Sequence, residues 1–124
     1  MVDPSVIRKT YEFWRTNFFT RDRIPKFYHN RLYPVDIQAC AQAVESAARY
    51  SVYDPESLAT AHQATEWIIR NMQKKKGAFR YRKYMLFGYA NPLEPIHWGQ
   101  ATMLSALGYL LYYSGLPGRN IQMP

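Results

Sequence analysis

The chain has 124 residues, of which 48% are apolar and 16% aromatic, so it is long enough for one small domain over residues 1–124 and too apolar to be disordered. Its formal net charge of +7 favours an anionic partner, but charge alone does not choose among acidic polysaccharide, nucleic acid and a membrane surface. A solvated basic surface without a specific partner is the alternative interpretation.

The single cysteine excludes an intrachain disulfide, and the spacing of Cys and His residues does not indicate a metal site. We therefore expect Cys40, which lies among alanines, to be a small core residue, and we expect neither a metal nor another cofactor. The N-terminus lacks the apolar segment of a signal peptide, and the uncharged run over residues 95–118 is too interrupted to span a bilayer. The sequence thus predicts a cytoplasmic location without membrane insertion.

The first predicted element is an amphipathic helix over residues 5–20. Its apolar residues Ile7, Tyr11, Trp14 and Phe18 recur at spacings of four, three and four, and charged residues occupy the other side. Residues 21–33 have no clear periodicity and are predicted to form a long loop.

A second helix is predicted from Pro34 to about Ser51. Proline is favoured at the first position of a helix, because its missing N–H would have no partner there. The segment is rich in alanine, so neighbouring helices can approach it closely, and we expect it to be central. A third helix follows Asp54 and Pro55 and extends to about Gln73.

The region after the third helix is less regular. Three lysines at residues 74–76 and Gly77 are typical of a helix C-terminus with a left-handed glycine. Apolar and charged residues alternate over residues 78–84, which predicts a short strand or one arm of a hairpin. Residues 88–95 are predicted to form a loop.

The fourth helix is predicted from Ile96 or Trp98 to about Ser114, with Gly115 at its end. Apart from His97 it has no ionisable charge, and a helix that is apolar all round is expected to be buried all round. In stacked antiparallel hairpins, the two long links would lie where the second and fourth helices begin. Asp36, His97 and Trp98 should therefore meet at one face, together with both long loops.

Three stretches, YPVDIQACAQA, EWIIRNMQKKKGAFRYRKY and IHWGQATMLSAL, resemble the C-terminal part of a bacterial αα-toroid family, which is six-hairpin-like and associated with surface and capsular polysaccharide genes. The resemblance implies an all-α fold of antiparallel αα-hairpins that form part of an (α/α) toroid, to which the residues themselves add one short β-hairpin. Four helices supply about a third of such a ring, so the resemblance implies either a homo-oligomer or the remainder of a longer toroid.

More distantly, Trp98-Gly99-Gln100 is similar to the helix start of unsaturated glucuronyl hydrolases. Those enzymes use an inner-helix Asp in acid/base catalysis on uronic-acid sugars. This resemblance implies that Asp36 is the acid/base and that Trp98 is a platform for a sugar.

The candidate catalytic residues are Asp36 and His97. The candidate substrate-binding residues are Tyr33, Gln42, Arg80, Tyr81, Trp98 and Gln100. Each has a structural alternative. The carboxylate of Asp36 can serve to stabilise the helix dipole and have no catalytic role, and a histidine at a helix N-terminus tends to stay neutral. The two glutamines can form hydrogen bonds with buried helix ends. The hairpin also contains Arg82 and Tyr84. The alternative for its charged residues is that they are exposed and keep the protein soluble, without binding a ligand.

Two functions follow from these residues. In the first, the chain belongs to an enzyme on acidic polysaccharide, a hydrolase, lyase or epimerase, with Asp36 and His97 in proton transfer. In the second, it is a non-catalytic helical module for binding an anionic glycan or a protein partner, or for oligomerisation. Nucleic acid is not expected as a partner, because no recognised nucleic-acid-binding pattern occurs.

Overall fold

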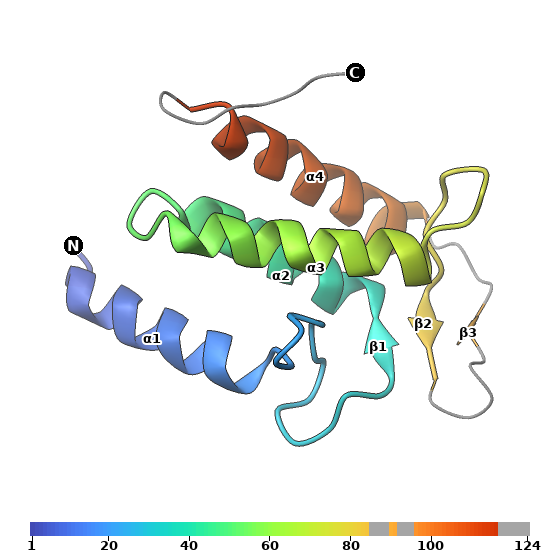
Figure 1. Cartoon of the computed structure of the whole chain (residues 1–124), viewed down its shortest axis with the longest axis horizontal. Helices are drawn as coiled ribbons and strands as arrows, with labels where there is room; N and C mark the ends of the chain where they lie inside the picture. The colour runs from blue at the N-terminus through green and yellow to red at the C-terminus, as the bar shows by residue number, and fades with distance from the viewer. Residues whose placement is uncertain (85–89, 92–95, 117–124) are drawn as a thin grey trace.

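The computed structural model describes residues 1–84, 90–91 and 96–116 (Figure 1). The described part is mostly helical, with three very short strands. The helices are α1 (Pro4–Asn17), α2 (Ile37–Tyr50), α3 (Glu56–Met72) and α4 (Ala101–Ser114), with the π-helix η2 (Ile96–Gln100) directly before α4. The strands are β1 (Val35–Asp36), β2 (Arg82–Lys83) and β3 (Ala90–Asn91).

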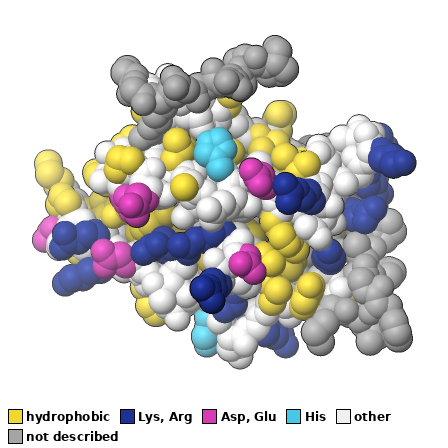
Figure 2. Space-filling model, in the orientation of Figure 1, with side chains coloured by type: hydrophobic (Ala, Val, Ile, Leu, Met, Phe, Trp, Pro, Cys, Tyr) yellow, Lys and Arg dark blue, Asp and Glu magenta, His cyan; other side chains and the backbone are white. Residues whose placement is uncertain are grey.

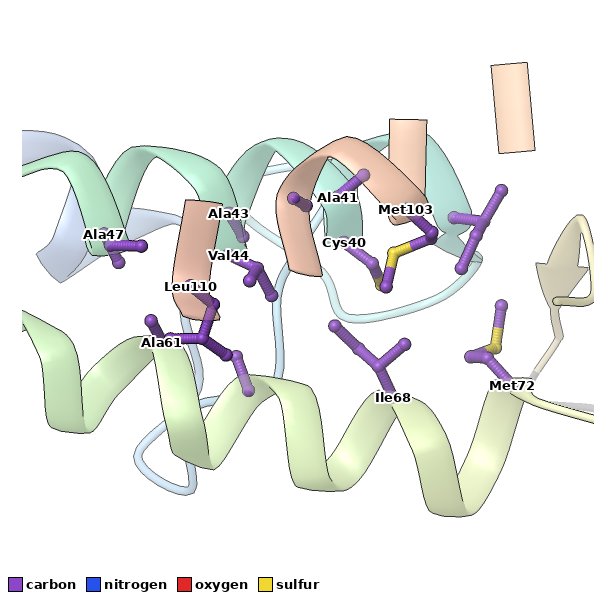
Figure 3. Packing of buried hydrophobic residues seen from close by; sticks show 14 of the residues in the cluster. Cys40, Ala41, Ala43, Val44, Ala47, Ala61, Ile68, Met72, Met103 and Leu110 are labelled. Atoms are coloured by element: carbon purple, nitrogen blue, oxygen red, sulfur yellow. The ribbon is translucent and has the colours of Figure 1, made fainter. Parts of the chain in front are cut away.

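Helix α2 lies at the centre, where it packs against both α3 and α4. Figure 3 shows Ala41, Ala43 and Ala47 of α2 in the same cluster as the larger side chains Ile68 of α3 and Met103 of α4. Small side chains allow the helices to approach closely, and seven of the fourteen α2 residues are buried. The prediction of a central second helix is confirmed.

Short polar side chains stand at the start of two other helices, and the one at the start of α3 confirms a prediction. Asp3 caps α1 by accepting a hydrogen bond from the backbone N–H of Ser5 at 2.8 Å. Asp54 accepts from the N–H of Glu56 at 3.1 Å, so it satisfies the start of α3 as expected. Helix α1 ends three residues earlier than predicted, because the chain after Asn17 turns into the first long link.

The start of α2 differs from the prediction. Pro34 is not the first residue of the helix: the Tyr33–Pro34 peptide bond is cis, Val35 and Asp36 are extended, and the helix begins at Ile37. The extended residues pair with β2, and the N–H of Ile37 donates to the carbonyl oxygen of Tyr81 at 3.0 Å. Pairing with a distant segment therefore overrides the local proline signal.

The strands form one antiparallel sheet in the order β1-β2-β3. Val35 pairs with Lys83 and Asp36 with Arg82, and β2 pairs in turn with β3. The predicted short strand within residues 78–84 is confirmed, whereas β1 was expected to be helical. Residues 90–91 of the predicted 88–95 loop form β3, and residues 88–89 and 92–95 lie outside the described residues.

The described parts of the two long links lie at the same end of the bundle. In Figure 1, α2 and α4 both begin beside the strands, and α1 and α3 both end on that side. Contacts between α2 and η2 also place the starts of the two inner helices together. The predicted meeting of both links at one end is confirmed.

Helix α4 is not buried all round. Met103, Ala106 and Leu110 face α2 and α3, but Leu104 and Tyr112 on the opposite side are exposed. The prediction that this helix is buried on all sides is therefore wrong: the described chain covers one side of α4 and leaves the other exposed. In the described residues, none of the helices is long and apolar enough to span a membrane.

Candidate functional site

Asp36 lies at the junction of β1 and α2, and it is only 2% exposed. One carboxylate oxygen, Oδ1, accepts from the N–H of Gln38 at 2.9 Å and so caps α2. The other oxygen, Oδ2, accepts from Nε of Arg82 at 2.7 Å. Because fixed donors hold both oxygens and water hardly reaches them, Asp36 is arranged as a structural anion.

Arg82 connects the two long links. Its guanidinium lies over the ring of Tyr81 at 4.9 Å and over the ring of Phe27 at 5.7 Å, while it pairs with Asp36. The hydrogen bond to Asp36 raises the pKa of Arg82 above its ordinary value. Arginine is protonated at physiological pH in any case, so Arg82 stays positively charged. Phe27 belongs to the first link and Tyr81 to the second, so this one side chain contacts both.

Other cations at this end are also placed against rings. The guanidinium of Arg31 lies 4.2 Å from the centre of the Tyr28 ring. The Nζ of Lys83 lies 5.4 Å from the Trp67 ring and donates to Oδ1 of Asn71 at 2.7 Å. Charge and flat apolar surface therefore occur together, which suits a ligand that has both anionic groups and ring faces.

We define the basic end as residues 18–36 and 73–84. It contains ten of the sixteen basic residues and two of the nine acidic residues, so its formal charge is +8. The remaining residues carry six basic and seven acidic groups, a formal charge of −1. Figure 2 shows the contrast: Lys and Arg alternate with Asp and Glu over α1, but gather without acids over the loop after α3. The whole excess charge of the chain thus lies in the two long links.

The predicted binding residues do not form one cluster. Tyr33 and Tyr81 are half-buried against the core, and the backbone N–H of Arg80 donates to the carbonyl oxygen of Met72 at 2.8 Å. Trp98 is exposed, whereas the backbone of His97 belongs to η2 and its side chain lies outside the described residues. The pairing of Asp36 with His97 therefore stays a prediction.

Gln42 faces a different surface from the basic end. Its Nε2 donates to Oγ of Ser46 at 2.8 Å, and its side chain lines a groove of about 390 Å³ between α2 and α4. Glu45 also lines this groove, which disfavours an anionic ligand there. A second hollow, of about 770 Å³, lies between α1 and the end of α2 and includes the same glutamate.

Gln100 links the start of α4 to the loop after α3. Its Oε1 accepts from the N–H of Phe79, and its Nε2 donates to the carbonyl oxygen of Phe79, both at 2.7 Å. Phe79 is buried, so these two bonds satisfy backbone groups that water does not reach. This is the structural alternative that the sequence left open for Gln100.

We expect Gln100→Ala to lower the free energy of unfolding by about 2 kcal/mol, because both backbone groups of Phe79 lose their partner. Urea denaturation followed by circular dichroism measures the change. Gln42→Ala is the control and should cost less than about 0.5 kcal/mol, because Gln42 is exposed. Equal losses in the two variants would contradict the role of Gln100.

Sequence reasoning missed the contact between Asp36 and Arg82. Arg82 was one of several cations in the expected hairpin, and only the pairing of β1 with β2 selects it. In the described residues, no group of three or more His, Cys, Asp and Glu side chains is placed to hold a metal ion.

Comparisons of the chain with protein-family models, with curated proteins and with solved structures found no match.

Proposed function

We propose that the protein is a non-catalytic module that binds an acidic polysaccharide through the basic end. The observation that carries this proposal is the concentration of a formal charge of +8 in two links that lie at one end of the bundle. Such a charge density attracts a polyanion and accelerates its association.

The geometry of Asp36 favours binding over catalysis. A general acid or base must come within hydrogen-bond reach of the reacting group. Asp36 is buried, and proton transfer would require the loss of its bonds to Arg82 and Gln38. Those bonds also hold the start of α2, so catalysis through this residue would disturb the fold.

An acidic sugar fits the combination of groups at the basic end. Arginine and lysine bind carboxylates, and aromatic rings pack against the apolar faces of sugar rings. Arg31 with Tyr28 and Lys83 with Trp67 provide such pairs. The stretches that resemble αα-toroid proteins linked to polysaccharide genes support the same class of ligand.

Binding can be tested by calorimetry with polygalacturonate as the acidic chain and dextran as the neutral chain. We expect polygalacturonate alone to bind, and its affinity to fall as salt is added, because charges near the surface are screened over about 8 Å at physiological ionic strength. Binding of both chains with equal affinity would contradict a charge-based site.

A pair of matched variants tests the position of the site. Lys75→Glu with Lys76→Glu reverses two exposed charges at the basic end and should weaken binding at least about ten-fold. Arg8→Glu with Lys9→Glu makes the same change in total charge on α1 and should have less than about a three-fold effect. Equal losses would show that only net charge matters. Tighter binding of a single-stranded nucleic acid than of polygalacturonate would favour the nucleic-acid interpretation instead.

A further inference from the structure

One side of α4 is apolar and exposed, which is unusual for the outer side of a surface helix. We define the exposed α4 face by its residues, which recur at spacings of three and four: Ala101, Leu104, Ser105, Gly108, Leu111 and Tyr112. The buried residues of α4 lie on the opposite side of the helix. No residue of α4 is charged, whereas a solvated helix face normally carries charged or polar side chains.

The area of this face approaches that of a specific interface. Leu104 is 74% exposed, Leu111 47% and Tyr112 63%, and Trp98, one turn before, is 68% exposed. Large side chains have about 150–250 Å² each, so the three large residues of the face together with Trp98 of η2, which precedes it, expose roughly 500 Å². The small residues between them and a shallow hollow beside Gly108 bring the face towards the ~800 Å² that each partner contributes to a stable complex.

We propose that two copies of this chain pair through the exposed α4 face, with the two α4 helices antiparallel about a two-fold axis. The absence of charge on the face allows copies with a net charge of +7 to meet there without direct repulsion. The antiparallel arrangement follows from the position of the basic end, which lies where α4 begins. Antiparallel pairing places the two basic ends at opposite ends of the dimer.

The shape of the face also fits pairing with itself. Ser105 and Gly108 lie near the middle of α4, and Leu104, Leu111 and Tyr112 extend to either side. A Cβ atom added at Gly108 would meet nothing within 4 Å, so the backbone is open to a neighbour at this point. Small residues at the crossing point let two helices approach closely, and a two-fold axis requires one face to match itself.

The oligomeric state provides the first test. We expect sedimentation equilibrium of the wild-type chain to show a dimer in the micromolar range, and Leu104→Glu to raise the dissociation constant at least about ten-fold. Phe13→Glu is the control, because Phe13 is an exposed apolar residue of α1, and it should leave the dimer unchanged.

Three outcomes of this test would overturn the proposal. A wild-type monomer at all concentrations would mean that another partner, or residues 117–124 of the same chain, covers the face. Oligomers whose mass grows steadily with concentration would indicate head-to-tail association instead. Equal weakening by Phe13→Glu would show that any added charge has the same effect. None of these outcomes bears on polysaccharide binding, so the two proposals fail separately.

Cysteine cross-linking tests the antiparallel arrangement. We place the two-fold axis at the level of residue 107, the middle of α4. Two copies of Gly108→Cys then lie close together. Two copies of Ala101→Cys are about 18 Å apart along the helices, at 1.5 Å per residue, which is too far for a disulfide. Diamide should therefore cross-link Gly108→Cys and not Ala101→Cys. Equal cross-linking of both variants would indicate parallel helices and would contradict the proposal.

The native Cys40 is not expected to form cross-links in this experiment. It is fully buried in α2, and burial, with a smaller contribution from the charge of Asp36, raises the pKa of its thiol. The reactive thiolate is therefore suppressed in the folded chain. The wild-type chain under the same oxidant provides the background.

Discussion

Ile68→Ala is expected to lower the free energy of unfolding by about 3–4 kcal/mol, the largest effect predicted for a single residue of this chain. Ile68 is 0% exposed, and Figure 3 shows its side chain projecting from α3 towards Cys40 and Met103. Removal of its outer atoms leaves a cavity where α3 meets the other two core helices. Urea unfolding measures the loss, and an unchanged dependence of the free energy on urea concentration would show that the unfolded reference is the same.

The adjacent residue provides a matched control. Ile69→Ala makes the same chemical change one position along the helix, but Ile69 is 43% exposed. We expect it to cost less than about 1 kcal/mol, since less apolar area is lost from contact. Similar losses in the two variants would mean that α3 does not pack in the orientation described.

Asp36→Ala is expected to cost about 3 kcal/mol. The loss of the helix cap accounts for about 1 kcal/mol, and the remainder comes from leaving the guanidinium of Arg82 without its counter-charge. The full cost of about 3–5 kcal/mol for breaking a buried pair does not apply, because Arg82 is partly exposed. Thermal and urea unfolding measure the change.

Asp36→Asn separates the two contributions. Asparagine is an effective helix cap, so this variant keeps the Oδ1 acceptor for the N–H of Gln38. Its Nδ2 takes the place of Oδ2, so the variant loses both the hydrogen bond and the charge pairing with Arg82. It should therefore lie between the wild type and Asp36→Ala. A double-mutant cycle with Arg82→Gln isolates the pair, and a coupling energy near zero would contradict the structural role of Asp36.

The features that depend on neighbouring residues could be predicted from the sequence. Asp54 caps the start of α3 as short polar residues normally do, and the alanines of α2 indicated a closely packed helix. The position of both long links at one end followed from the order of exposed and buried helices, and Figure 1 agrees with it.

The features that depend on distant residues could not be predicted. Val35 and Asp36 pair with residues more than forty positions away, so the proline before them gave a misleading helix signal. The amide of Gln100 suits a ligand hydroxyl as well as the backbone of Phe79, and only the fold selects between them. For α4, a composition that is apolar all round predicted burial on every side, and only the fold shows which side the described chain covers.

Arg82 holds Asp36 through its Nε, so a ligand cannot take this donor without breaking the pair. A ligand that drew its guanidinium away would leave a buried carboxylate without compensation at the start of α2. In the proposed complex the cations around Arg82 provide the main contacts with the ligand, while Arg82 itself contacts a ring of each link. If the basic end binds its ligand as proposed, these contacts hold the two links in place beforehand, so the protein would lose little conformational entropy when it binds a rigid polymer of matching charge spacing.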